Sequence, residues 1–402
     1  MSHSPIHAHA RPAAQGQASI VLKLLPIVLA VFVGFLTIGL PLPVLPLHLQ
    51  NTLGMNTLVV GLTVGSQFAF ALLSRAWAGG LADTRGARRA VLSGLLVAAA
   101  SGIAYLCSLA FTGQPSTALA VLLLGRLLLG CGESLVVTGA LSWGVGLVGP
   151  QNAGKVMAWV GIAMYGAYAL GAPAGMALYS AYGFAGVASA TALVPLLALL
   201  IVLPVRGIAP AAARRLPFYK VLGSVWVPGL GLALCSTGFG VITAFIALLF
   251  AARRWDNAAL AFTAFGLAFI GARLLFGHLP DKIGGARVAL VCVLIEALGQ
   301  LLIWGAEHSL AAYVGAALTG FGYSLAFPGF GVEAVRRAPP QSRGAAMGAF
   351  VAFLDISLGL TGPAAGAIAT AAGVNAVYLC GAVLVLLSAL VAAWLCTRKV
   401  PA

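Results

Sequence analysis

The stretch that decides the fold is RAWAGGLADTRGARR, residues 75–89, because the chain repeats it. At an offset of 198 residues it aligns with RLLFGHLPDKIGGAR, residues 273–287. Recurrence at this separation indicates two related halves. The identical aligned positions are Arg75/Arg273, Gly79/Gly277, Leu81/Leu279, Asp83/Asp281, Gly86/Gly284 and Arg89/Arg287.

A second block of the repeat follows at an offset of 190 residues. Both blocks run in the same direction, so we expect two parallel halves of six helices each, joined by the basic, proline-containing segment 205–220. The pairs in this block are Gly130/Gly320, Gly132/Gly322, Ser134/Ser324, Pro150/Pro340, Gln151/Gln341, Gly154/Gly344, Met157/Met347 and Pro173/Pro363.

The composition excludes a water-soluble globule. Apolar residues make up 61% of the 402 residues and charged residues only 7%, and the mean hydropathy is +1.05. Hydrocarbon offers no hydrogen-bond partners, so apolar runs of about 20 residues predict membrane-spanning helices. We count twelve such runs: 20–48, 57–80, 89–111, 117–141, 155–180, 184–204, 221–250, 258–279, 288–306, 311–335, 344–370 and 375–397.

The net charge of +14 is interpreted through its position relative to the membrane, not as a sign of a nucleic-acid partner. With both termini on one side, seventeen basic residues fall on that side and only Arg253 and Arg254 on the other. The positive-inside rule therefore predicts cytoplasmic termini. The predicted parts are a disordered cytoplasmic tail at 1–19, bundles at 20–204 and 221–397, a cytoplasmic linker at 205–220, and a cytoplasmic tail at 398–402.

Three motifs carry a resemblance to a known family. GGLADTRGARR, residues 79–89, resembles the signature loop of the major facilitator superfamily, and GRLLLGCGES, residues 125–134, resembles the fourth-helix arginine motif of its proton-coupled members. GAPAG, residues 171–175, is similar to the fifth-helix antiporter motif, although Ala172 separates a Gly-Pro pair that is usually adjacent. Over nearly its full length the chain resembles poorly characterised inner-membrane efflux permeases of bacteria.

The resemblance implies an all-α membrane protein with twelve transmembrane helices in two pseudo-symmetric six-helix bundles. It further implies proton-coupled efflux of a small organic molecule by alternating access, in a bacterial inner membrane, with no cofactor beyond the proton gradient. A proton-coupled importer, a uniporter and a lipid-translocating facilitator share this fold and remain alternatives. We expect a monomer whose partners are its substrate, protons and lipid.

An enzyme is not expected. Within the spans we find no clustered Ser, His and Asp and no His or Cys spacing typical of metal ligands, so neither catalytic nor metal-binding residues are predicted. The six cysteines fall within predicted spans and are interpreted as small apolar residues.

The signature loop and its repeat are predicted to form a gate. Gly79 permits close helix approach, Gly86 permits positive φ, and Asp83 can cap a helix N-terminus. The resemblance implies that Asp83 and the loop arginines hold the halves together while the cavity faces outward. The alternative is that these residues only set topology. The gating residues are Gly79, Asp83, Gly86, Arg89, Asp281, Gly284 and Arg287.

Two Gly-Pro clusters are expected to mark helix bends or tight helix seams, since glycine exposes backbone and proline removes a hydrogen bond. Gly171, Pro173 and Gly175 lie in the fifth predicted helix, and Gly362 and Pro363 in the eleventh.

The acids Glu133, Glu296 and Asp355 fall inside predicted spans. Each costs at least about 2.5 kcal/mol if unpaired and ionised at mid-membrane, so they mark functional or paired sites. Arg126 and Glu133 are seven residues apart and share one helix face. We expect Glu133 to carry the proton, with Asp355 second, while Arg126 tunes it or binds an anionic substrate group. A static ion pair across helices is the alternative.

Two further sets complete the predicted site. Glu296 is expected to be structural, and Arg75 and Arg273 to bridge helices or extend to the membrane surface. The helices that usually line the cavity in this family supply polar and aromatic candidates. An arginine on that wall favours an acidic or zwitterionic substrate. The cavity candidates are Thr37, Tyr165, Ser236, Thr237 and Tyr323, and further candidates are Thr138, Tyr168, Thr243 and Ser324.

Overall fold

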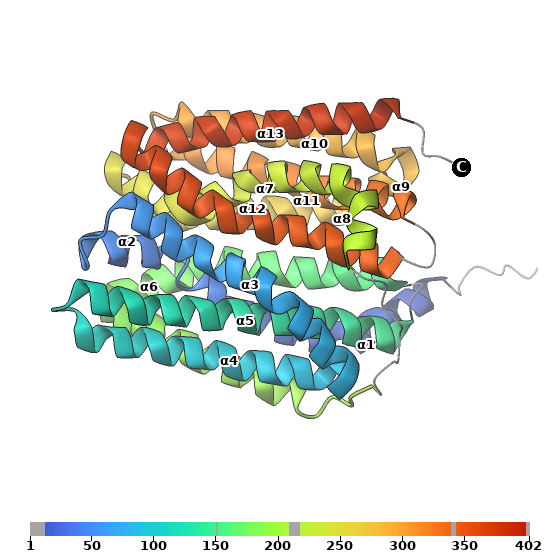
Figure 1. The fold of residues 1–402 in the computed structure, drawn as a ribbon, viewed down its shortest axis with the longest axis horizontal. Coiled ribbons are helices and arrows are strands. Elements are labelled where there is room, and N and C mark those ends of the chain that lie inside the picture. Colours follow the sequence, from blue (N-terminus) through green and yellow to red (C-terminus); the bar gives the residue numbers. More distant parts are fainter. Residues whose placement is uncertain (1–12, 150–151, 209–217, 339–342, 399–402) are drawn as a thin grey trace, which may run out of the picture.

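The computed structural model describes residues 13–149, 152–208, 218–338 and 343–398, and within these ranges it contains helices and turns but no strand (Figure 1). The helices are α1 Ala13–Gly39, α2 Val44–Asn51, α3 Thr57–Arg85, α4 Ala87–Ser108, α5 Pro115–Val148, α6 Ala153–Val202, α7 Phe218–Arg253, α8 Ala259–Phe276, α9 Leu279–Ile283, α10 Gly285–Trp304, α11 Ser309–Arg337, α12 Arg343–Ala372 and α13 Val374–Thr397.

Twelve passes account for these helices, as the sequence predicts. Eleven continuous segments of the described chain are long and apolar enough to span a membrane. One of them, α6, contains Gly183 with φ 63° and ψ −161°, a conformation that interrupts the helix between the fifth and sixth predicted spans. The first span also breaks, where Pro41 and Pro43 lack a backbone N–H, and resumes as α2.

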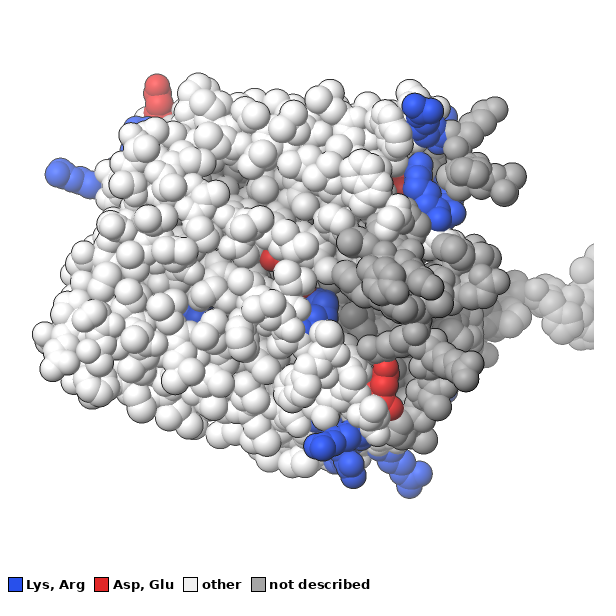
Figure 2. All heavy atoms as spheres, viewed as in Figure 1, with Lys and Arg blue, Asp and Glu red and all other residues white. Residues whose placement is uncertain are grey.

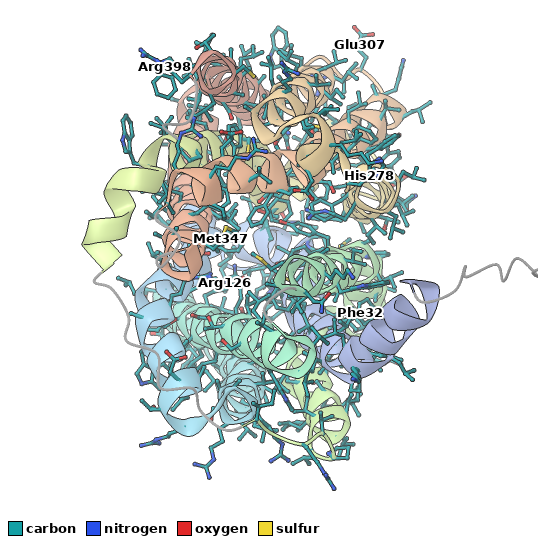
Figure 3. The ribbon with its side chains drawn as sticks, turned by 90° about the vertical axis from the view of Figure 1, so that its right-hand side faces the viewer. Phe32, Arg126, His278, Glu307, Met347 and Arg398 are labelled. Atoms are coloured by element: carbon teal, nitrogen blue, oxygen red, sulfur yellow. The ribbon has the colours of Figure 1, made fainter. Side chains whose placement is uncertain are left out.

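The helices form two bundles that lie side by side, α1–α6 in one and α7–α13 in the other (Figure 1). Viewed from the end at which the described chain begins and finishes, Arg126 of α5 and Met347 of α12 lie where the bundles face each other (Figure 3). Apolar side chains such as Leu73 and Leu96 are exposed on the outside, at 73% and 55%. An apolar exterior is stable only against lipid.

Charged residues gather at the two ends of the molecule, and the face shown in Figure 2 has few between them. The start of α1 and the end of α13 lie at the same end of the molecule (Figure 1). This placement of the described ends agrees with an even number of passes.

Two predicted boundaries are wrong. Helix α1 begins at Ala13, within the tail predicted at 1–19, because the segment AAQGQAS consists largely of residues that tolerate helix and contains no proline. Helix α7 begins at Phe218, within the linker predicted at 205–220, directly after Pro217. Residues 1–12 of the predicted tail, 209–217 of the linker and 399–402 lie outside the described residues.

The repeat is visible in backbone geometry. Gly86, between α3 and α4, has φ 97°, and its counterpart Gly284, between α9 and α10, has φ 99°. Side chains rarely tolerate this region, so both positions require glycine. The predicted positive φ at Gly86 is therefore confirmed.

Candidate functional site

Helix α3 carries side chains that meet an acid from each half of the molecule. The Gln67 side-chain amide donates a hydrogen bond of 2.7 Å to Oε2 of Glu133 on α5. Two turns further along α3, Nη2 of Arg75 lies 2.6 Å from Oδ2 of Asp355 on α12. Eight residues of helix span about 12 Å, so the two contacts lie about two turns apart along α3.

The Arg75–Asp355 ion pair joins the two halves. The Asp355 side chain is 5% exposed and that of Arg75 is 21% exposed. Removing one partner of a buried pair leaves an uncompensated charge, at a cost of about 3–5 kcal/mol. The pair therefore favours the arrangement in which α3 and α12 touch.

Arg126 also turns toward α3. Its Nε donates to the Thr63 carbonyl at 3.3 Å and its Nη2 to the Val64 carbonyl at 3.0 Å. Arg126 and Glu133 thus reach the same neighbouring helix, as their spacing predicts. Because Arg126 is only 1% exposed, it is closed to a ligand in this conformation, and its substrate role stays a prediction.

A small internal cavity lies beside Glu133. Its volume of about 10 Å³ is close to the minimum for one water molecule. Helices α1, α4 and α5 form its walls, which are otherwise apolar. The lining residues are Gly34, Phe35, Ile38, Leu95, Ala98, Leu129, Gly132, Glu133 and Val136.

A cluster of six aromatic residues spans the boundary between the halves. We call it the aromatic cluster, and it consists of Tyr165 and Tyr168 of α6, Phe239 of α7, Phe265 and Phe269 of α8, and Tyr323 of α11. Tyr165 stacks on Phe269 with ring centroids 3.8 Å apart. On the other side, the ring of Phe239 lies 5.7 Å from Tyr168 and 5.8 Å from Tyr323. The cluster closes the space between α6 and the second half.

The predicted cavity residues are buried here except Thr138, which is half-buried. Tyr165 and Tyr323 belong to the aromatic cluster, and Oγ of Ser236 donates to the Leu232 carbonyl and lies 3.4 Å from the Tyr323 hydroxyl. Thr237 bonds its own helix, and the Thr37 hydroxyl has no partner among the described residues. The structure brings together the two tyrosines and Ser236 but leaves Thr37 apart, in α1.

The Gly-Pro clusters form seams between helices that remain continuous. A side chain at Gly362 of α12 would overlap the Gly61 carbonyl of α3, and at the same seam Thr57 and Thr370 share a hydrogen bond of 2.8 Å. Gly171 of α6 packs on the backbone of Gly39, the last residue of α1, and Gly175 packs on the backbone of Leu40, which follows it. Both α6 and α12 continue as helix through Pro173 and Pro363. Tight packing is therefore observed at both clusters, and their role as helix bends stays a prediction.

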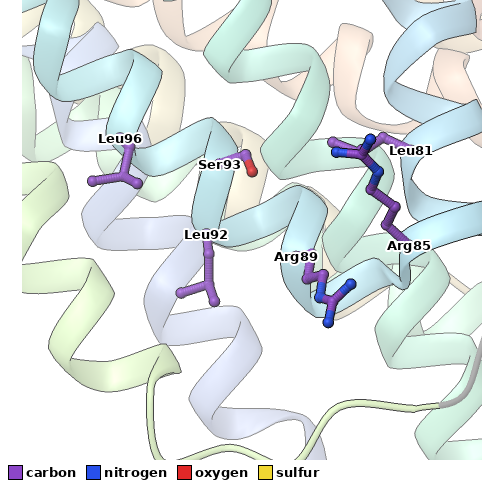
Figure 4. A pocket seen from close by; sticks show the side chains of 6 residues that line it. All are labelled: Leu81, Arg85, Arg89, Leu92, Ser93 and Leu96. Atoms are coloured by element: carbon purple, nitrogen blue, oxygen red, sulfur yellow. The ribbon is translucent and has the colours of Figure 1, made fainter.

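The predicted gating residues lie at the junction of α3 with α4 and at its repeat. Gly79 is buried and Asp83 is half-buried. The exposed members are Arg89, Asp281 and Arg287. A pocket of about 390 Å³ opens at this junction (Figure 4). Its lining combines two arginines with leucines: Leu81, Arg85, Arg89, Leu92, Ser93 and Leu96. The gating role remains a prediction.

Glu296 lies deep in the second half, away from these contacts. It is 0% exposed, and neither carboxyl oxygen has a hydrogen-bond partner among the described residues. One turn along α10, Gln300 donates to the Gly238 carbonyl and to Thr319. The expectation that Glu296 is structural stays a prediction.

Sequence reasoning missed Gln67 and the three phenylalanines of the aromatic cluster. Gln67 has no motif of its own, but it is a polar residue inside an apolar span, which is a signal. Phe265 and Phe269 are spaced one turn apart on α8, which indicates only a shared helix face.

Comparisons with known proteins agree on one family. The model of the Major Facilitator Superfamily matches residues 27–256 and 230–402. An uncharacterized MFS-type transporter of Salmonella typhimurium is 46% identical over 375 residues, covering 93% of this chain and 97% of its own. Another, from Pseudomonas aeruginosa, is 45% identical over 370 residues, covering 92% of each chain.

Solved structures show the same fold at low identity. The nucleoside transporter NupG superposes with a TM-score of 0.76 at 14% identity, over 93% of this chain and 99% of its own. A bacterial homolog of the human lysosomal transporter Spinster, inward-facing and occupied, gives a TM-score of 0.73 at 17% identity, over 98% and 100%.

Proposed function

The chain belongs to the major facilitator superfamily and is therefore a membrane transport protein, and from this premise we propose that it exports a small organic molecule in exchange for protons. The observation that carries the proposal is the Arg75–Asp355 ion pair between the halves. In alternating access the two halves rock against each other around a central site. Protonation of a charge pair that joins the halves can shift the equilibrium between the conformation in which they touch here and the one in which they are apart.

The proton acts by removing a charge. When Asp355 is protonated, Arg75 loses its ionic partner, and the contact between α3 and α12 is weakened. Protonation of Glu133 adds a donor where the Gln67 amide already donates, so this contact must also rearrange. Both acids contact side chains of α3, Glu133 through Gln67 and Asp355 through Arg75. Protonation of an acid in either half can therefore alter the seam between α3 and α12.

The direction of transport rests on the efflux branch that the motifs resemble. An importer would carry protons and substrate the same way, and a uniporter would need no proton. Measuring proton flux together with substrate flux distinguishes these alternatives. The two fluxes are opposite in an exchanger and parallel in an importer, and a uniporter has no proton flux.

Proteoliposomes with an imposed pH gradient and an internal pH-sensitive dye test the proposal against a panel of metabolites and drugs. We expect at least one compound to move against the proton flux. Movement in the same direction as protons would identify an importer, and movement without proton flux a uniporter. If no compound moved and no proton flux followed, the antiport proposal would fail.

Variants of the acids identify the coupling group. We expect Asp355→Asn and Glu133→Gln to reduce proton-driven transport to near background while both proteins remain in the membrane. Glu296→Gln is the matched control, since this acid is buried like Asp355 but lies away from the α3–α12 seam. Normal transport by Glu133→Gln would remove Glu133 from the mechanism and leave Asp355.

A further inference from the structure

The internal repeat relates two seams between the halves. In the first seam, Arg75 of α3 pairs with Asp355 of α12. The offset of 198 relates Arg75 to Arg273 of α8, and the offset of 190 relates Asp355 to Tyr165 of α6. Helices α8 and α6 also touch, where the Thr263 hydroxyl donates to the Ala169 carbonyl at 2.7 Å. The second seam therefore keeps the arginine but has a tyrosine in place of the acid.

Arg273 is held without a carboxylate. Its Nη2 donates to the Ser324 carbonyl at 2.5 Å, and its Nε lies 3.4 Å from the Ser324 hydroxyl. No acid lies within ion-pair distance of it in the part of the chain that the structure describes. A guanidinium group has five N–H donors, so these two contacts leave donors free.

An aromatic surface adjoins this charge. The Arg273 guanidinium carbon lies 5.2 Å from the ring centroid of Phe269, one turn earlier on α8. The same ring stacks on Tyr165 at 3.8 Å, and Tyr323 lies 6.0 Å from Tyr165. A cation at the edge of the aromatic cluster matches a ligand with an anionic end and an apolar body.

Accessibility and the lack of an acid partner together distinguish Arg273 from the other two arginines within the spans. Arg126 is 1% exposed and enclosed by carbonyls, and Arg75 is neutralised by Asp355. Arg273 is half-buried, so part of it can be reached. A cation within the membrane is costly unless an anion or dipoles compensate it.

We propose that Arg273 binds the anionic group of the substrate, and that the aromatic cluster, which is closed in this conformation, binds an apolar or aromatic body attached to it when the halves move apart. The substrate class is therefore a lipophilic organic anion, such as an aromatic carboxylate. The proposal rests on the proposed transport function and names its substrate. It replaces the sequence-based interpretation of Arg273 as only a bridge between helices.

Equilibrium binding to the full-length protein in neutral detergent tests the class without a gradient. Isothermal titration calorimetry compares naphthoate with two probes, naphthylmethanol, which lacks the charge, and acetate, which lacks the apolar body. We expect naphthoate to bind at least about tenfold more tightly than either, because a charge-assisted contact and apolar burial both contribute. Equal affinity for naphthoate and naphthylmethanol in the wild-type protein would overturn the proposal.

Two variants locate the site. Arg273→Gln should weaken naphthoate binding about tenfold or more, whereas Arg253→Gln, which removes an exposed arginine, should not change it. Tyr165→Asp places an acid where the first seam has Asp355, and it should abolish naphthoate binding by pairing with Arg273. Unchanged binding in Tyr165→Asp would contradict the relation between the seams, and this readout remains if Arg273→Gln fails to fold.

An anionic lipid headgroup could also bind Arg273. A further experiment distinguishes the lipid from a small-molecule substrate. Mixed micelles with phosphatidylglycerol should not compete with naphthoate, and Arg273-dependent binding of the lipid alone would overturn the small-molecule assignment. Failure of the antiport proposal is distinguishable, since naphthoate binding could persist without proton coupling. Conversely, proton-coupled transport of other compounds with no naphthoate binding would refute only this inference.

Discussion

The acids within the spans are accommodated in three different ways. Asp355 has an arginine from the other half, Glu133 has a neutral amide from its own half, and Glu296 has no partner among the described residues. A proton changes an ion pair most, because it removes the attraction and leaves the arginine uncompensated. At the scale of single residues, Asp355 is therefore better suited than Glu133 to link protonation to the position of the halves.

A double-mutant cycle tests the Arg75–Asp355 pair. Arg75→Gln alone should lower stability by up to about 3–5 kcal/mol, because it leaves a buried acid unpaired. Adding Asp355→Asn should recover much of this loss but not proton-driven transport. Thermal unfolding in detergent and proteoliposome flux measure the two effects. Additive losses in the double variant would mean that the residues do not interact.

Glycines make the close backbone contacts at two helix seams. Gly61 and Gly362 bring the backbones of α3 and α12 into contact, and Gly171 and Gly175 do the same for α6 and the end of α1. The adjacent pair Gly362–Pro363 thus lies on the seam between the halves, whereas the interrupted pair Gly171/Pro173 lies within the first half. The two motifs have similar sequences and differ in which helices they join.

Gly362→Ala tests the inter-half seam. Its methyl group would overlap the Gly61 carbonyl, so we expect a loss of about 1–3 kcal/mol, measured by thermal unfolding. Gly161→Ala is the matched control, since open space surrounds this helical glycine and alanine favours helix. Equal melting temperatures for the two variants would show that the seam is not tightly packed in the membrane protein.

At the scale of the whole molecule, the closely packed contacts between the halves lie toward the end that carries α2. The Thr57–Thr370 hydrogen bond and the glycine contacts near it belong to this end, and the Arg75–Asp355 pair lies deeper along α3. The charge distribution predicts that this end faces outward. The conformation is therefore one in which the predicted outer side is closed.

Cysteine labelling tests this orientation. In a cysteine-free background, a membrane-impermeant maleimide should label Asp256→Cys on intact cells but not Arg398→Cys, because the positive-inside rule places Arg398 in the cytoplasm. Both positions are exposed in the structure. Labelling of Arg398→Cys alone would reverse the predicted topology, and permeabilised cells, in which both react, provide the control.

Sequence alone predicted the architecture well and the site only in part. The span boundary at Gly183 and the positive φ of Gly86 follow from local chemistry, and both are confirmed. The start of α1 was wrong because a helix can extend beyond its apolar run. The partner of Glu133 was missed because a single glutamine in α3 has no pattern that connects it to α5.

The sequence by itself determined the membrane class, the twelve spans and the two-half repeat, because these depend on composition, run length and recurrence along the chain. Only the tertiary structure decided which charges meet. Arg75 and Asp355 are far apart in sequence, and no local rule relates them until α3 and α12 pack together. Arg273 lies over Phe269 of its own helix, whereas Tyr165 of α6 and the Ser324 carbonyl of α11 join it only because these helices pack against α8.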